Sequence, residues 1–420
     1  MGLDGWVSRQ PRWSGRALVG LLLLAVACGT TAQPPPVRQG SDLLVGASLS
    51  LTGSLAGEGQ LTQQGYQMWL DWINGQGGIE VAGVRHRVQL LLRDDQSRPD
   101  LSEALATDLV KGSGVQFLLG PYGSDSTAAV AAVAEQYQVP LVEAGGAAQA
   151  IFSRGYRYTF GVLSLTDQYM SGVIDMVGRL APRPRTIALL AADDRFSQEV
   201  AESVRDRGPM RGMEIVLSLS YPAGSTDVTA LVARAAAVQP DILVNSGHLA
   251  EAVAIHRAAR AEALDARVFA YSVGPSTPEF IAELGPDADY VFAGAQWTPQ
   301  MRYRPQTYLT APAYVAAYKR RFRTLLEPAY QTAQATAAGL ALQRAIEDAH
   351  TTQPQAVRDA LAGLDVMTFY GRLKFDSRGA NVYKPMVVEQ IQHSRHHTVY
   401  PPEVADAMPA YPTPPWSVRA

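Results

Sequence analysis

Short apolar runs alternate with amphipathic segments along most of the chain. Apolar runs predict strands at 43–50, 87–93, 115–119 and 139–142. Between them, apolar residues at helical spacing predict helices over 60–74 and 101–110. The rhythm then starts again, with strands predicted at 186–190, 213–217, 241–244 and 268–271. Strands and helices that alternate in this way indicate parallel sheets with helices on both faces, so we predict two doubly wound α/β lobes. Ligands of such sheets bind beyond the carboxyl ends of the strands.

The beginning of the chain has the pattern of an export signal. Arg9, Arg12 and Arg16 precede the apolar run 17–27, which is shorter than the roughly 20 residues that a membrane-spanning helix needs. Cys28, the only Cys of the chain, follows directly and resembles the lipidated Cys of a bacterial lipobox. We therefore predict a lipoprotein signal peptide over 1–27 and a lipid anchor at Cys28. The protein is then exported and anchored on the periplasmic or outer face of the cell. The alternative is an ordinary signal peptide with an incidental Cys.

The composition is that of a soluble globular protein, with 47% hydrophobic and 18% charged residues. Removing 1–27, which carries three Arg and one Asp, changes the formal charge from -3 to about -5. No basic run follows the leader, which argues against a nucleic-acid partner. A Pro-rich tether is predicted over 28–42. The six Pro of 401–420 indicate a tail that lies on the surface or is disordered.

Several short motifs occur in a fixed order between residue 43 and about residue 392. They are Gly46-Ala-Ser-Leu-Ser-Leu-Thr-Gly-Ser54, Ile73-Asn-Gly-Gln-Gly-Gly-Ile79, Asp94-Asp-Gln-Ser97, Gly120-Pro-Tyr-Gly-Ser124, Arg154-Gly-Tyr156, Gln296-Trp-Thr-Pro299 and Tyr370-Gly-Arg-Leu-Lys-Phe-Asp376. As an ordered set they resemble the type I periplasmic binding proteins, in particular the leucine/isoleucine/valine-binding kind that serves ABC importers. The resemblance implies a protein that binds an amino acid or related small carboxylate and delivers it to an ABC permease.

The resemblance also implies the domain organisation. Two lobes are joined by three crossovers, here near Ser164, Trp297 and Phe369, and close on a ligand between them. Lobe 1 combines 43–164 with 298–368, and lobe 2 combines 165–297 with 369–400. We expect a monomer that uses neither a cofactor nor a metal.

In the first lobe, the resemblance places ligand contacts in two loops. Ser124 follows the third predicted strand, and a hydroxyl with free N–H groups at a helix start favours a carboxylate. The alternative is that Ser124 only caps its helix. Its neighbour Tyr122 either lines a pocket for an aromatic or flat carboxylate or packs in the core. Gly145, Gly146 and Ala147 follow the fourth strand, where backbone N–H groups are expected to grip the same carboxylate. The alternative for this loop is a simple turn.

In the second lobe, family aromatic positions map to Phe196 and His248. His248 either hydrogen-bonds the ligand or caps the helix that follows. Ser272 or Val273 stands where amino-acid binders place a Glu that pairs with the ligand ammonium. An ammonium buried without a counter-charge costs several kcal/mol, so another acid must replace this Glu or the ligand has no ammonium. Glu58 is the first candidate, with the acids Asp125 and Glu143 as others. Each is equally compatible with a solvated surface role.

Other classes of function find less support. No nucleophile elbow, zinc-protease motif or phosphate-binding loop is present, which argues against an enzyme. His393, His396 and His397 lack paired ligands at zinc-like spacing. A ligand sensor built on the same two-lobed module, reporting to a signalling partner, is the main alternative to an importer component, and an exported enzyme is the weaker one.

Overall fold

The computed structural model describes residues 38–419. The expected signal peptide and the lipid site at Cys28 lie outside these residues, as does most of the expected tether. Within them, no helix is both long and apolar enough to cross a bilayer.

The first lobe is built on a parallel sheet of β-strands in the order β5-β2-β6-β7-β8. These strands are β2 (Leu43–Leu49), β5 (Val88–Asp94), β6 (Phe117–Leu119), β7 (Leu141–Glu143) and β8 (Thr159–Gly161). A small sheet at its start joins β1 (Arg38–Gln39), β3 (Ile79–Val81) and β4 (Val84–His86). The helices of this lobe are α1 (Ala56–Gly75), α2 (Pro99–Lys111), α3 (Ser124–Tyr137), α4 (Gln149–Phe152), α10 (Ala311–Phe322), α11 (Tyr330–Ala349) and α12 (Pro354–Ala362).

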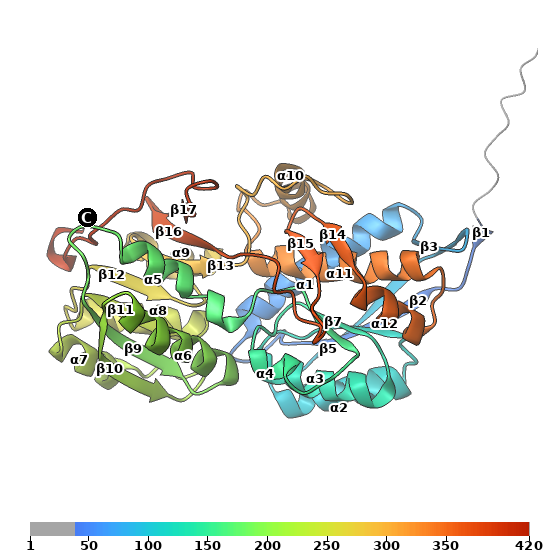
Figure 1. Ribbon diagram of the computed structural model, residues 1–420, viewed down its shortest axis with the longest axis horizontal. Helices are drawn as coiled ribbons and strands as arrows, with labels where there is room; N and C mark the ends of the chain where they lie inside the picture. The colour runs from blue at the N-terminus through green and yellow to red at the C-terminus, as the bar shows by residue number, and fades with distance from the viewer. Residues whose placement is uncertain (1–37, 420) are drawn as a thin grey trace, which may run out of the picture. The chain divides into compact units, whose positions relative to one another are not determined.

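The second lobe repeats this order in the sheet β10-β9-β11-β12-β13 and extends it with antiparallel β16 and β17. The strands are β9 (Thr186–Ala192), β10 (Glu214–Tyr221), β11 (Ile242–Ser246), β12 (Val268–Tyr271), β13 (Val291–Ala295), β16 (Val387–Gln392) and β17 (Arg395–Tyr400). Its helices are α5 (Ser171–Val177), α6 (Arg195–Met210), α7 (Thr229–Ala237), α8 (Leu249–Ala261) and α9 (Pro278–Leu284), with 3₁₀ turns η1 (Thr166–Gln168), η2 (Gly285–Ala288) and η3 (Trp416–Val418). The two lobes are distinct in Figure 1.

The structure confirms the predicted fold class. Each strand predicted from an apolar run is present with bounds that differ by a few residues. The inner strands are buried because helices cover both faces of each sheet, whereas the edge strands β5 and β10 are only partly buried. The antiparallel strands β16 and β17 were not predicted.

Helix α11 shows how segments far apart in the sequence form the first lobe. This Ala-rich helix packs along α1, and the two are adjacent in Figure 1. Thr332 and Thr336 on α11 donate side-chain hydrogen bonds to carbonyls of α1. A Cβ on Gly339 would come within 2.3 Å of the Trp69 ring. A side chain at 339 would therefore force the helices apart.

The three connections between the lobes are joined to one another. Gln296, at the end of the second connection, exchanges hydrogen bonds with the backbone of Ser164 in the first (3.0 and 2.9 Å). Lys384 lies in the third connection, where its carbonyl accepts from Ser164 Oγ (2.7 Å) and its buried Nζ donates to Gln296 O (2.7 Å).

The third connection lies later in the chain than Phe369, where it was expected. The motif Tyr370-Gly371 forms the turn of a hairpin between β14 (Asp365–Met367) and β15 (Arg372–Lys374), with Gly371 at φ +138°. Ala380 then still pairs with Gly161 at the edge of the first sheet. The chain therefore leaves the first lobe only after this bridge, because the hairpin belongs to that lobe.

Residues 401–419 lie against the second lobe. Thr413 N donates to Arg267 O (3.0 Å), and Trp416 donates from its backbone N to Asp265 and from Nε1 to Leu264 O (2.8 Å each). The Arg419 guanidinium stacks 3.7 Å from the Trp416 ring centre. This segment, which we call the C-terminal strap, is therefore held by specific contacts rather than disordered.

Candidate functional site

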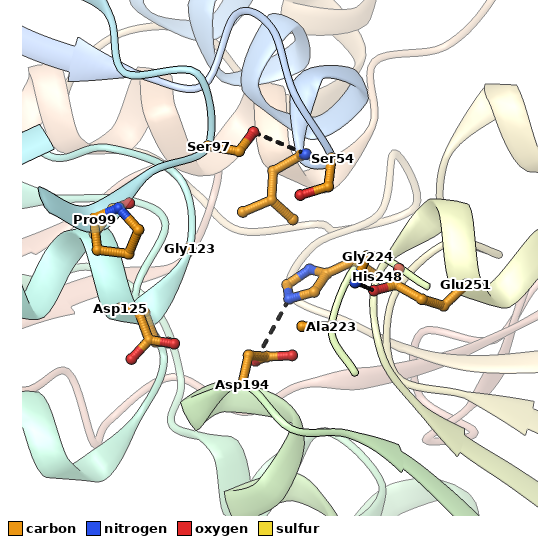
Figure 2. A pocket seen from close by; sticks show the side chains of 13 residues that line it. Ser54, Ser97, Pro99, Gly123, Asp125, Asp194, Ala223, Gly224, His248 and Glu251 are labelled. Atoms are coloured by element: carbon orange, nitrogen blue, oxygen red, sulfur yellow. Dashed lines mark hydrogen bonds and ion pairs between the residues drawn. The ribbon is translucent and has the colours of Figure 1, made fainter. Parts of the chain in front are cut away.

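The main pocket lies where the carboxyl ends of both sheets come together. In each sheet the strand order reverses beside the first strand, between β2 and β6 and between β9 and β11. Loops that leave such a pair in opposite directions open a crevice, which is where doubly wound folds bind ligands. Loops from both lobes surround one pocket in Figure 2, lined by Ser54, Ser97, Gly123, Ser124, Asp125, Asp194, Gly224, His248 and Glu251 among others.

A smaller inner cavity shares Ser124 and His248 with this pocket. Its walls are mainly aromatic and come from both lobes: Tyr122, Gly145, Ala147, Leu163, Tyr169, Phe196, Val273, Tyr330 and Gln334. The rings of Phe196 and His248 lie 5.5 Å apart, and Tyr169 packs edge-on against Phe196 at 4.8 Å. The inner cavity has room for about one water-sized group, so a larger ligand must occupy the outer pocket or move these walls.

The structure brings most of the predicted ligand-binding residues together. Tyr122, Ser124, Gly145, Ala147, Phe196 and His248 all line the inner cavity. Ser272 does not, because its hydroxyl is bonded to both the N–H and the carbonyl of Gly247 (3.0 and 2.9 Å). Gly146 does not either, since a Cβ there would meet Thr127 and Ile151 of the core. Glu58 lies behind His248 and lines neither space.

The backbone of Gly145 and Gly146 is not free to grip a carboxylate, which corrects the expectation. Both N–H groups donate to Glu143 Oε2, at 2.9 and 2.6 Å. Burial raises the pKa of Glu143 to about 8 although these N–H groups lower it. The carboxyl group therefore organises the loop after β7, so it is neither a solvated surface acid nor a free partner for an ammonium.

His248 is the electrostatic centre of the site. Its Nε2 lies 3.7 Å from Asp194 Oδ1 and its Nδ1 lies 3.9 Å from Glu58 Oε1. Figure 2 shows the ring between the two lobes, directed at Asp194. Burial lowers the pKa of His248, but Asp194 and the nearby acids outweigh it and raise the pKa to about 9. The ring is thus an imidazolium at neutral pH. Its Nδ1 is buried and has no hydrogen-bond partner among residues 38–419.

The acids around His248 are already engaged. Glu58 accepts from the backbone N of Leu249 (2.9 Å), which caps α8 across the lobe boundary, and burial raises its pKa. Asp194 caps α6 through Ser197 N (3.0 Å), and although burial opposes it, the pairing with His248 holds its pKa at about 2. Asp125 pairs with Arg195 Nε across the lobes (3.0 Å). None of the three is an unpaired counter-charge for a ligand ammonium.

A further carboxylate joins the lobes beside the site. Glu199 on α6 of the second lobe accepts from the backbone N–H groups of Gln149 (2.6 Å) and Ala150 (3.1 Å), the first residues of α4. It also accepts from Thr166 Oγ1 (2.7 Å). The second lobe thus caps a helix of the first, as Glu58 of the first lobe caps α8 of the second.

The sequence analysis did not identify Tyr330 and Gln334, which lie one helical turn apart on α11 and both line the inner cavity. Gln334 Oε1 is buried without a partner in residues 38–419. The available signal was a polar side chain in the buried, Ala-rich part of a helix. Asp194 was also missed, although Asp-x-x-Ser marks a helix cap.

Comparisons with known proteins agree with this architecture. The family model described as periplasmic binding protein matches residues 43–396. The Leu/Ile/Val-binding protein homolog 8 of Brucella suis is 24% identical over 408 residues, covering 93% of this chain and 98% of the relative. The leucine-, isoleucine-, valine-, threonine-, and alanine-binding protein of Pseudomonas aeruginosa is 25% identical over 329 residues, covering 78% and 84%.

Two solved structures share the fold. LivJ of Streptococcus pneumoniae, in complex with isoleucine, has a TM-score of 0.75 at 23% identity and covers 86% of this chain and 100% of its own. A solute-binding protein of an ABC transporter from R. palustris, in complex with benzoate, has a TM-score of 0.74 at 16% identity, with 85% and 95% covered.

Proposed function

Because this chain belongs to the family of periplasmic binding proteins, we propose that it is the solute-binding component of an ABC importer. Its ligand is an amino acid or a related small carboxylate, bound between the lobes and delivered to a permease. The relatives named for branched-chain amino acids and the fold neighbour bound to benzoate support this range of ligands. The protein acts as a monomer held at the membrane by a lipid on Cys28.

The observation that carries the ligand class is the buried, cationic ring of His248, which lines both the outer pocket and the inner cavity. A carboxylate placed against this ring gains a charge-assisted contact. Ser124 also lines both the outer pocket and the inner cavity, so its hydroxyl adds a second contact to the ligand carboxylate. The aromatic walls then take the apolar part of the solute.

Glu58, Asp125 and Asp194 are each satisfied by a partner, so an ammonium would have to compete for one of them, which favours carboxylates without an ammonium. Glu251, which lines the outer pocket and accepts from Gly224 N (2.8 Å), has no ion pair among residues 38–419 and is the acid that an ammonium would use. Lobe 1 comprises 43–164 and 298–381, and lobe 2 comprises 165–297 and 385–400. The ligand shifts the equilibrium toward joined lobes only to the extent that it contacts both of them.

Titration calorimetry of the soluble chain from residue 29 tests the proposal. L-leucine, L-phenylalanine, benzoate and benzamide are the probes. We expect carboxylates to bind and benzamide to fail, and we expect affinity to fall as pH rises through about 9, where His248 loses its proton. His248→Gln should weaken binding about 10- to 150-fold. His350→Gln, at an exposed position, is the control. Equal binding of benzoate and benzamide would exclude the anion contact.

A further inference from the structure

A second cavity lies between the lobes at their connections. The first lobe contributes Glu327 to Tyr330 and the second contributes Ser276, Pro278, Glu389 and His396, while Trp297 and Pro299 come from the second connection. Tyr330 lines both this cavity and the inner solute cavity, so one aromatic side chain separates them. We call this second space the connection cavity. None of its acids has a role in the proposed solute site.

Glu389 is the unusual group in the connection cavity. It lies in the middle of the extended sheet, on β16 between Ala293 of β13 and Thr398 of β17. It is 7% exposed, and that remaining exposure faces the cavity. Lys319, on the rim of the neighbouring groove, pairs with Glu327 (3.6 Å) rather than with Glu389. Burial raises the pKa of Glu389 to about 8.

Ser276 contributes a hydroxyl to the same wall. Its Oγ is buried close enough to Glu389 to lower the pKa of that carboxyl, and it has no hydrogen-bond partner of good geometry in the part of the chain that the structure describes. A carboxyl and a hydroxyl that lie side by side in one wall, with hydrogen-bonding capacity left over, gain from a ligand that bonds both. His396 does not fill the cavity, because its Nε2 is bonded to Pro275 O (2.6 Å). The remaining walls are Pro, Ala and aromatic side chains.

The donor set fits an ammonium group better than a metal ion. Hard cations take six or more oxygen ligands, and residues 38–419 contain no group of three His, Cys, Asp or Glu side chains that could hold a metal. An ammonium has three donors, for which Glu389 and Ser276 offer acceptors, and aromatic rings such as Trp297 and Tyr330 attract cations. The space beside these groups has room for one group of about the size of a water molecule.

The cavity opens into a wider groove that indicates what the ammonium is attached to. The groove shares Pro278, Glu327 and His396 with the cavity and holds about 1180 Å³ of space. Leu325 and Leu326 on its side are 93% and 58% exposed, and Ile281 also lines it. We propose that the connection cavity binds a primary amine, with its ammonium at Glu389 and Ser276 and its apolar tail in the groove beside Leu325 and Leu326.

Calorimetric titration of the exported chain with hexylammonium chloride tests this site, with hexanol and hexanoate as probes of the same length. We expect hexylammonium to bind at one site and the other two to fail. Measured above pH 8, where the Glu389 carboxyl is ionised, Glu389→Gln keeps the shape and removes the charge, and it should raise the Kd for hexylammonium about tenfold or more. Ser276→Ala should raise it severalfold. Glu403→Gln, an exposed acid of the same lobe, is the matched control.

The outcomes separate this site from the solute site. Because the proposal does not depend on which solute the main pocket takes, His248→Gln should leave hexylammonium binding unchanged. Binding that is lost in His248→Gln and kept in Glu389→Gln would place the amine in the main pocket and overturn the proposal. Equal binding of hexanol would show that only the apolar groove is involved. No binding by a wild-type chain that unfolds cooperatively would also overturn it.

Discussion

The carboxylate of Glu199 is expected to control how strongly the lobes hold together. It accepts three hydrogen bonds, from the backbone N–H groups of Gln149 and Ala150 and from Thr166 Oγ1. The two N–H groups belong to the first lobe and Glu199 to the second, so the contacts exist only while the lobes are joined. Glu199→Ala removes all three acceptor contacts at once.

The magnitude follows from the exposure of the site. A hydrogen bond to a charged group is worth about 1.5–3 kcal/mol when water is excluded. Glu199 is only half-buried, and both backbone N–H groups can be hydrated once the lobes part. We therefore expect Glu199→Ala to reduce the free energy that favours joined lobes by about 1–2 kcal/mol, well below the simple sum of three such bonds. This reduction corresponds to about 5- to 30-fold in the equilibrium between joined and separated lobes.

Hydrogen exchange at Leu249 measures this equilibrium without any ligand, since its N–H is bonded to Glu58 across the lobe boundary and Glu199→Ala leaves that bond in place. We expect Glu199→Ala to increase exchange at Leu249 by the same 5- to 30-fold. Glu202→Ala, at an exposed position on the same helix, should have no effect. Unchanged exchange in Glu199→Ala would refute the reasoning and show that the contact does not hold the lobes together.

Two further predictions concern stability and are tested by urea unfolding, and a third is tested by hydrogen exchange. Gly339→Ala should destabilise by about 1–3 kcal/mol, because its Cβ would meet the Trp69 ring at 2.3 Å, whereas Gly75→Ala, with nothing within 4 Å, should not. Glu143 has its pKa raised from 4.5 to about 8, so the folded state keeps a proton that the unfolded state releases, and stability should fall as pH rises from about 5 to 8. In Glu143→Gln the fall in unfolding free energy with pH should become less steep, by at most about 1.4 kcal/mol per pH unit. An unchanged slope would contradict the raised pKa of Glu143. Lys384→Met should loosen the joined connections by removing the bond to Gln296 O, seen as faster exchange at 164–166 with little loss of global stability.

The sequence predicted eight of the parallel strands because each contains a short apolar run, as 241–244 shows for β11, but it did not predict the parallel strands β8 and β13. It did not predict β16, since Glu389 and Gln390 lie within that strand and interrupt its apolar pattern. The resemblance placed the third connection near Phe369, but it lies later because Tyr370-Gly371 forms the turn of a hairpin that belongs to the first lobe.

The site shows the same limit at the level of single residues. The resemblance placed Ser124, Phe196 and His248 near one another, and their positions after the carboxyl ends of strands are consistent with that placement. The pattern could not show that Glu143 occupies the N–H groups of Gly145 and Gly146, because a carboxylate that folds back on its own loop has no distinctive spacing. Tyr330 reaches the cavity from a helix more than two hundred residues away from Ser124, which no local pattern predicts.

The C-terminal strap has a mechanical consequence for the second lobe. Its contacts tie Pro182, before β9, to Arg267 and Leu264, before β12, all at the end of the sheet away from the site. Movement of the second lobe about the connections reaches its pocket loops undiminished only if the lobe itself bends less than the connections do. By binding the far ends of these strands together, the strap stiffens the second lobe, so that bending is concentrated in the three connections and every loop that this lobe presents to the pocket travels as one.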